Sequence, residues 1–190
     1  MNEPSFNVAA LKRCVRSEGP YKRLAIWFQG CNICCNGCCN PDLIPLIMKH
    51  KIKLSVMLDI IRSSKKEFDI EGITLLGGEP TLQNGLPILC KRVREMGLGV
   101  ILFTGNLFDD LAPDIKNNVD LVIDGKYEKN LPDSERNMIG SSNQRIIDVT
   151  GRYEHILYWF TDKRGKYVEI SLEDGELEIN GDYLPLDIQN

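Results

Sequence analysis

The sequence predicts an α/β fold in which parallel strands are joined by crossover helices, with an antiparallel β extension at the C-terminus. Short apolar runs alternate with helical periodicities between residues 24 and 123, which is the pattern of a parallel sheet. Several of these runs end in glycine or polar residues. From about residue 150 onward the helical periodicity is replaced by strand-like pieces between turn signals.

The first half of the predicted sheet is built around two short apolar runs. Residues 24–28 predict a buried strand that ends at Gln29-Gly30, and residues 72–76 predict the next strand. Between them, apolar residues at helical spacing predict a helix over about 55–67, with Ser55 in position to cap its first turn. The two strands are therefore expected to run parallel across a helical connection.

The same pattern then repeats with a weaker second helix. Residues 85–96 predict a helix closed by glycine, and 98–103 a strand. Residues 106–116 predict a weaker helix broken near Pro113, and 119–123 a final strand.

Four of the expected strand ends carry residues suited to ligand binding. Ligands of parallel sheets bind beyond the carboxyl ends of the strands. The segments at these ends are Gly30-Cys31, Gly77-Gly78-Glu79, Thr104-Gly105 and Asp124-Gly125. We therefore expect them to meet at one rim of the sheet.

The C-terminal segment is expected to form a separate β element. Residues 153–160, 167–172 and 177–180 have strand composition, with turn signals at 162–165, Asp174-Gly175 and Asn180-Gly181. This divides the chain into a core domain over residues 1–149 and a hairpin or meander extension over 150–190.

Composition narrows the class of protein. The 190 residues suit one domain, and 43% apolar residues are enough for an ordinary core. The sequence shows no apolar membrane span and no signal peptide, so we expect a cytoplasmic protein.

Residues 1–66 carry 11 Lys/Arg against 4 Asp/Glu, whereas residues 67–190 carry 12 against 23. The basic half is either ordinary solvated surface or the side that meets an acidic electron donor. No nucleic-acid partner is expected.

Five of the seven cysteines fall within nine residues, a density that indicates metal binding rather than a disulfide framework. Cys31, Cys35 and Cys38 have the spacing C-x3-C-x2-C. Three thiolates on one short loop can hold three irons of a 4Fe-4S cluster and leave the fourth iron open. Cys34 and Cys39 allow other triplets, and four thiolates would also suit a structural zinc ion. The roles of Cys14, Cys34 and Cys39 stay open, whereas Cys90 falls on the apolar stripe of its helix and is expected in the core.

The cysteine motif and five further segments resemble the radical S-adenosylmethionine superfamily, and within it the activating proteins of anaerobic ribonucleotide reductase. These segments are the run from Glu18 to Gly30, Cys35-Asn36-Gly37-Cys38-Cys39-Asn40, Leu76-Gly77-Gly78-Glu79-Pro80, Phe103-Thr104-Gly105, and Val122 to Lys126 followed by Gly140-Ser141-Ser142-Asn143-Gln144-Arg145. Cys39 stands where that family usually has tyrosine. Together the matches cover about residues 5–148.

The resemblance implies a partial, laterally open (β/α) barrel that binds a 4Fe-4S cluster and S-adenosylmethionine. It places the cluster on Cys31, Cys35 and Cys38. The residues implied to contact the second cofactor are Gly37, Cys39, Gly77, Gly78, Glu79, Thr104 and Asp124. Glu79 would pair with the ammonium group of the methionine moiety, and Thr104 would either donate its hydroxyl hydrogen to the ligand or cap a helix.

The resemblance also implies a macromolecular substrate. The expected partner is a glycyl-radical enzyme such as anaerobic ribonucleotide reductase, met by a loop that includes Lys126, Asn143, Gln144 and Arg145. The expected electron donor is a flavodoxin or ferredoxin. A pterin- or nucleoside-like small substrate is the alternative within the superfamily, and an electron-transfer or zinc module is the alternative outside it.

Overall fold

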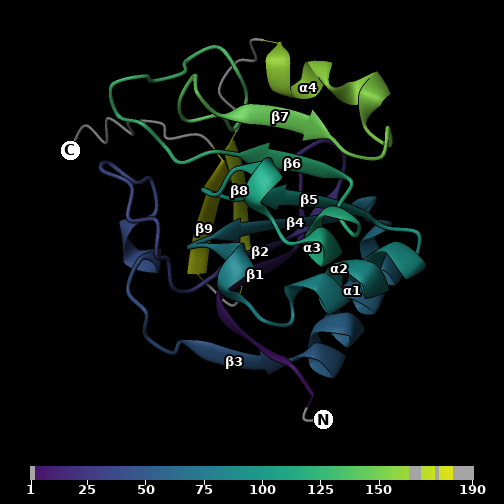
Figure 1. Ribbon diagram of the computed structural model, residues 1–190. Coiled ribbons are helices and arrows are strands. Elements are labelled where there is room, and N and C mark those ends of the chain that lie inside the picture. The colour runs from purple at the N-terminus through teal and green to yellow at the C-terminus, as the bar shows by residue number, and fades with distance from the viewer. Residues whose placement is uncertain (1–2, 163–167, 174–175, 182–190) are drawn as a thin grey trace, which may run out of the picture.

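A seven-stranded sheet forms the centre of the protein, for which the computed structural model describes residues 3–162, 168–173 and 176–181. The strand order is β3-β1-β2-β4-β5-β6-β7 (Figure 1). The four inner strands β2 (Arg23–Phe28), β4 (Gly72–Gly77), β5 (Gly99–Phe103) and β6 (Leu121–Asp124) are parallel. The flanking strands β1 (Ser5–Val15), β3 (His50–Lys53) and β7 (Arg145–Asp148) are antiparallel to their neighbours. Because β3 and β7 remain as edges, the sheet is open, and the predicted laterally open α/β fold is confirmed.

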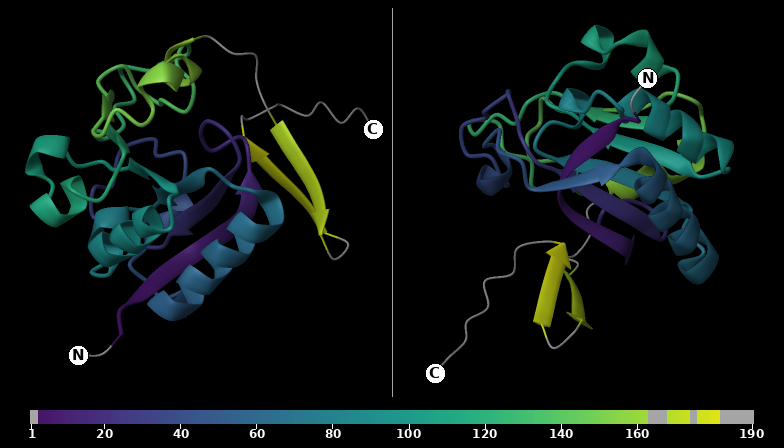
Figure 2. Two further views of the ribbon diagram at one scale, coloured as in Figure 1. Left: turned by 90° about the vertical axis from the view of Figure 1, so that its right-hand side faces the viewer. Right: turned by 90° about the horizontal axis from the view of Figure 1, so that it is seen from below.

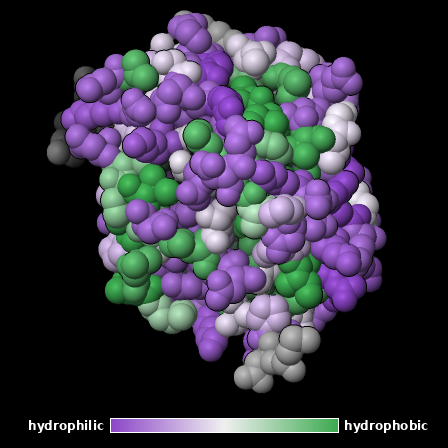
Figure 3. Space-filling view, in the orientation of Figure 1, coloured by the Kyte–Doolittle hydropathy of each residue, from purple (hydrophilic) through white to green (hydrophobic). Residues whose placement is uncertain are grey.

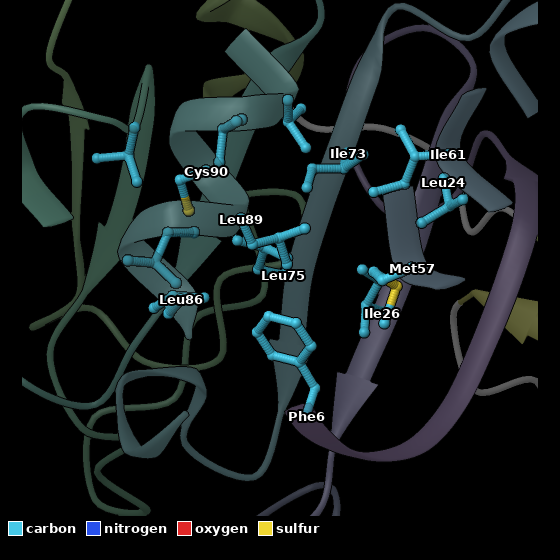
Figure 4. Close-up of a cluster of buried hydrophobic side chains, with 14 of the residues drawn as sticks. Phe6, Leu24, Ile26, Met57, Ile61, Ile73, Leu75, Leu86, Leu89 and Cys90 are labelled. Carbon is cyan, nitrogen blue, oxygen red and sulfur yellow. The ribbon is translucent and has the colours of Figure 1, made fainter. Parts of the chain in front are cut away.

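One face of the sheet is covered by the crossover helices (Figures 1 and 2). They are α1 (Leu54–Phe68), α2 (Leu86–Glu95) and α3 (Pro113–Lys116). In Figure 4 the side chains of α1 and α2 point at β2 and β4, and the labelled residues are buried, including Cys90, whose predicted core position is confirmed. No helix in the described part of the chain is both long and apolar enough to cross a membrane.

Two helix predictions differ in detail from the structure. Ser55 does not cap α1: the N-cap position is Lys53, and the Glu3 carboxylate accepts a hydrogen bond from the Ser55 backbone N–H at 2.6 Å. The helix expected over 106–116 is two short pieces, a 3-10 helix at Phe108–Asp110 and then α3. Pro113 begins α3 rather than breaking it, because proline is well accommodated in the first turn, where no backbone N–H is needed.

The opposite face of the sheet packs against residues 153–160, and the strand predicted there is wrong. The segment forms a 3-10 helix at Glu154–Ile156 and α4 (Tyr158–Thr161). Its apolar residues are buried together with Ile101, Leu121 and Ile123 of the sheet. The buried positions are Tyr153, Ile156, Trp159 and Phe160, a spacing of three and four that is helical rather than alternating.

The last described elements are β8 (Val168–Glu173) and β9 (Glu176–Gly181), which form the antiparallel hairpin that was predicted. Figure 2 shows it beside the main body rather than within the large sheet. The Glu169 carboxylate accepts hydrogen bonds of 2.9 and 3.0 Å from the backbone N–H groups of Arg16 and Ser17. The predicted turns at 162–165 and 174–175 lie wholly or partly outside the described residues, and Asn180-Gly181 is the end of β9. The domain division at residue 150 stays a prediction.

Candidate functional site

A cleft of about 1190 Å³ opens at the carboxyl ends of the parallel strands. Its wall includes Trp27, Leu76 and Phe103. The residues immediately before these three, one on each strand, belong to the core under the helices. Since successive side chains of a strand point to opposite faces, the cleft lies on the face of the sheet away from α1 and α2. Two further side chains of this wall, Met138 and Trp159, were not predicted, because they follow the strand-and-helix part of the sequence.

The cysteine loop forms one side of this cleft. Cys31, Cys35, Cys38 and Cys39 line it, whereas Cys34 does not. Cys34 is exposed, has a positive φ of 50°, and donates its thiol to the Cys31 carbonyl at 3.7 Å. Gly37 also has a positive φ, of 80°. Glycine adopts this backbone conformation without steric cost, so the position favours glycine whether or not it contacts a ligand.

The thiols of Cys31, Cys35 and Cys38 fit the donor set of a cluster. Partial burial raises the pKa of Cys35, and the neighbouring thiolates of Cys38 and Cys31 raise it further. All three residues line the same cleft. Among the described residues, no three His, Cys, Asp or Glu side chains are close enough to share one metal ion. A cubane does not require such closeness, because each thiolate binds a different iron.

Gly77 and Gly78 are required by the packing of the backbone. A Cβ at Gly77 would lie 2.3 Å from the Phe28 nitrogen, and a Cβ at Gly78 would lie 2.2 Å from the Gly30 carbonyl oxygen. We expected these glycines to make room for a ligand. Both line the cleft, so that role stays a prediction. They also make room for the end of β2, so that the strand ends carrying Cys31 and Glu79 can approach each other.

Glu79 is almost completely buried at the cleft, where four donors hold its carboxylate. Oε1 accepts hydrogen bonds from the Thr81 N–H and hydroxyl at 3.0 and 2.7 Å and from the Thr104 hydroxyl at 2.8 Å. Oε2 accepts one hydrogen bond, from the Gly105 N–H at 2.9 Å. Because each carboxylate oxygen offers about two acceptor positions, Oε2, which accepts this one hydrogen bond, has room for another donor, such as an ammonium group.

Thr104 lines the cleft and holds the Glu79 carboxylate in position. Its single hydroxyl hydrogen is used on Glu79, and its oxygen accepts from the Asn106 N–H at 3.1 Å. Thr104 does not cap a helix, since the N-cap of the following 3-10 helix is Leu107, and its contact with the cofactor stays a prediction. The sequence could not show the contact between Thr104 and Glu79, because the hydrogen bond joins residues 25 positions apart.

Replacing Thr104 with valine is therefore expected to weaken cofactor binding. The change keeps the side-chain shape but leaves the buried Glu79 carboxylate with one donor fewer, at a cost of about 1–3 kcal/mol. We expect the Kd for S-adenosylmethionine, measured by anaerobic calorimetry on the reconstituted protein, to rise about tenfold. Thr104→Ser is the control and should restore the wild-type Kd. Equal Kd values for all three proteins would contradict this role.

Asp124 does not reach the cleft. It is fully buried and accepts hydrogen bonds from the Phe108 N–H at 2.7 Å and from the Arg145 guanidinium at 3.0 Å. Burial alone would raise the pKa of Asp124, but these hydrogen bonds and the Arg145 charge lower it below its ordinary value. Asp124, which we expected at the cofactor, thus fixes the start of β7 to the end of β6.

The other predicted loop residues mostly bind their own loop. Gln144 accepts from the Gly140 and Ser141 N–H groups and donates to the Gly125 carbonyl, while Asn143 donates to the Lys126 carbonyl. Gln144 and Gly125 also line the cleft. Lys126 is exposed. The G-S-S-N-Q-R run therefore gives the loop over residues 125–145 a fixed shape at the cleft, and the Lys126 side chain is left facing solvent.

Comparisons with known proteins identify proteins that are similar to this chain. Residues 17–147 match the family model described as a 4Fe-4S single cluster domain. The chain is 30% identical to the anaerobic ribonucleoside-triphosphate reductase-activating protein of Enterobacteria phage T4, over 79% of this chain and 99% of that protein. It is 32% identical to a Haemophilus influenzae protein provisionally named a glycyl-radical enzyme activating enzyme, over 48% of this chain and 36% of that protein. The crystal structure of QueE from Escherichia coli aligns with a TM-score of 0.45 at 15% identity, covering 73% of this chain and 64% of QueE.

Proposed function

The chain belongs to the 4Fe-4S single cluster domain family and is a radical S-adenosylmethionine enzyme of the glycyl-radical activating type, and on this basis we propose that it acts on a backbone glycine of an anaerobic ribonucleotide reductase. The observation that carries this proposal is the similarity to the phage T4 activating protein, which spans 99% of that protein. A pterin- or nucleoside-like small substrate is less favoured, because the similarity to an activating protein extends over nearly the whole of the open-sheet core.

The enzyme uses a 4Fe-4S cluster together with S-adenosylmethionine. When bound, these groups supply the electron and the sulfonium from which a 5′-deoxyadenosyl radical is made, and this radical abstracts a hydrogen atom from the substrate. We infer that Cys31, Cys35 and Cys38 hold three irons. These three thiols line the cleft together with Cys39, whereas Cys34 lies outside it. The C-x3-C-x2-C spacing supports Cys38 rather than Cys39 as the third ligand.

The chain's own residues bind and orient the cofactor. Glu79 is placed to accept the methionine ammonium on Oε2, and Thr81, Thr104 and Gly105 keep that carboxylate from rotating. Such a charge-assisted hydrogen bond is about twice as strong as a neutral one. A fixed carboxylate also spares the cofactor the cost of ordering it on binding.

The size and the walls of the cleft suit a polypeptide substrate. Its apolar side includes Trp27, Phe103 and Trp159, which keep water away from a reactive radical. Its other side includes polar residues of the 125–145 loop, among them Asp133, Ser134 and Arg136. We infer that a glycine-bearing segment of the partner enters between these two sides. We also infer a cytoplasmic location, because the crowded free thiols of the cysteine loop require a reducing compartment.

Electron paramagnetic resonance tests the proposed substrate. Holoenzyme, dithionite, S-adenosylmethionine and a candidate anaerobic ribonucleotide reductase are mixed without oxygen. We expect the doublet of a glycyl radical, and no doublet from a reductase variant in which the target glycine is alanine. A silent spectrum together with the release of 5′-deoxyadenosine would reject this partner while leaving the cofactor chemistry intact.

A further inference from the structure

Three consecutive apolar side chains are exposed on the segment that joins the cysteine loop to β3. Leu46, Ile47 and Met48 are 74, 53 and 65% exposed. Figure 3 shows apolar side chains gathered on the left flank of the molecule, over the segment that precedes β3 in Figure 1. Single exposed apolar residues are common, but a contiguous group rimmed by polar residues marks an interaction site. We refer to residues 46–48 as the apolar ridge.

The backbone of the apolar ridge is held in place by two amide side chains. Gln29 donates to the carbonyls of Asp42 and Pro45 at 3.2 and 2.8 Å. Asn7 donates to the Ile47 carbonyl at 2.8 Å and accepts from the Lys49 N–H at 2.9 Å. The ridge is thus presented to solvent on a fixed backbone, which lowers the entropic cost of binding a partner.

The apolar ridge lies against the outer side of the cysteine loop. A Cβ built on Gly30 would be 3.1 Å from Leu46 Cδ2, and the Cys31 N–H donates to the Ile44 carbonyl at 3.0 Å. Residues 46–48 do not line the cleft, whereas the cluster cysteines do. A partner on the ridge would therefore approach the cysteine loop from outside and leave the cleft free for the glycine-bearing substrate.

The sequence that follows the apolar ridge is basic, with the Glu3 carboxylate beside Lys53 at its far end. Lys49, Lys51 and Lys53 follow it and are exposed, and Asp42 is the one acidic residue within 41–53. Residues 1–66 as a whole carry a surplus of seven basic residues. Such a field raises the rate of encounter with an acidic protein and makes that rate depend on salt. A small apolar centre with a charged border also suits the short-lived complexes of electron transfer, which bury little surface.

We propose that the apolar ridge and the lysines that follow it are the docking surface for a small acidic protein that carries single electrons. The inference rests on the proposed function, because it assumes that the cysteine loop holds a cluster that must receive an electron. The reduced carrier gives up one electron and is oxidised by one electron, and the cluster held by the loop is reduced by one. No covalent bond changes and no proton moves in this step.

Two variants and one control test the surface. Ile47→Asn/Met48→Asn removes two of the three apolar side chains, and Lys49→Glu/Lys51→Glu reverses the charge. Lys66→Glu/Lys91→Glu makes the same charge change on the helix-covered face. Binding of oxidised flavodoxin to each holoenzyme is measured by calorimetry at low and high salt, without S-adenosylmethionine. We expect the Kd to rise about tenfold in both ridge variants and to stay unchanged in the control, with the wild-type affinity falling as salt increases.

The rate of 5′-deoxyadenosine formation is then compared with two reductants. With flavodoxin hydroquinone the ridge variants should be about tenfold slower, whereas with dithionite, which needs no docking surface, they should match the wild type. An unchanged flavodoxin Kd would overturn the proposal. An equal loss of the rate with dithionite would overturn it too. A loss of the glycyl-radical signal alone, with an unchanged rate of 5′-deoxyadenosine formation, would also overturn it, because it would assign the ridge to binding of the substrate protein. The proposed substrate is tested separately, by the glycyl-radical doublet obtained with dithionite as the reductant. The proposed docking surface and the proposed substrate can therefore fail independently.

Discussion

Single replacement of Cys31, Cys35 or Cys38 by alanine is expected to abolish both stable iron binding and cleavage of S-adenosylmethionine. Each change removes one of the three thiolates assigned to the cluster, which line the cleft together with Cys39, and a cubane that loses one of only three protein ligands is poorly held. Iron and sulfide content after anaerobic reconstitution, together with the visible absorption of the cluster and the yield of 5′-deoxyadenosine, measures the effect. We expect activity to fall by at least about a thousandfold.

Cys34→Ala is the matched control for these three variants. Cys34 lies in the same loop but is exposed, and its thiol points to the Cys31 carbonyl rather than into the cleft. Iron content and turnover close to wild type are expected. A Cys34 variant without iron, or a Cys38 variant with full iron, would show that the cluster uses another triplet of cysteines.

Replacement of Arg23 by methionine is expected to cause the largest loss of stability. Arg23 is completely buried at the start of β2 and donates to Glu71 at 2.6 Å, to the Thr74 hydroxyl at 2.7 Å and to the Tyr153 hydroxyl at 3.0 Å. Removing one partner of a buried ion pair leaves the other charge uncompensated, which costs about 3–5 kcal/mol. Arg152 still pairs with Glu71, so we expect a loss near the lower end, about 3 kcal/mol, in denaturant unfolding.

The loss should also depend on pH. Burial alone would raise the pKa of Glu71, but Arg23 and the hydrogen bonds from Tyr153 and Arg152 lower it below its ordinary value. A carboxylate with a lowered pKa stabilises the folded state above its unfolded pKa, and this contribution is lost as the pH falls through the folded pKa. The difference between wild type and the Arg23 variant should therefore be largest near pH 7 and smaller below about pH 4.

Arg13→Met supplies the comparison for an exposed ion pair. Arg13 and Glu67 are in contact at 2.5 Å, but both are more than one-third exposed. Exposed pairs contribute about 0–1 kcal/mol. Equal losses for the Arg23 and Arg13 variants would contradict the structural role of the buried network.

The inner strands were predicted correctly because their residues satisfy a local pattern. β2, β4, β5 and β6 are short apolar runs that are buried on both faces, and such runs are recognisable without knowledge of their partners. β1 was not predicted, although Phe6 and Val8 alternate with more polar neighbours, because its second half is basic and gives no clear period. Residues 153–160 were assigned to a strand on their aromatic content, whereas the positions that are buried follow helical spacing.

The positions of the site motifs could be predicted from the order of strands along the chain, but the side-chain partners of the site residues could not. The cysteine spacing and the Gly-Gly-Glu segment lie at strand ends and could be placed at one rim of the sheet. The partners of Thr104 and Asp124 could not be inferred, because Glu79 and Arg145 approach them only through the fold. The apolar ridge was equally hidden, since a run such as Leu46-Ile47-Met48 is more often buried than exposed.

The close contact between Gly78 and Gly30 has a mechanical consequence. The Glu79 N–H donates to the Gly30 carbonyl at 2.8 Å, and the two loops have no space between them for even one extra carbon. The cysteine loop and the segment that carries Glu79 are thus held together by direct backbone contact. A displacement of either segment must shift the other. The distance between the cysteine loop and Glu79 is therefore set by the polypeptide before the cluster or S-adenosylmethionine binds.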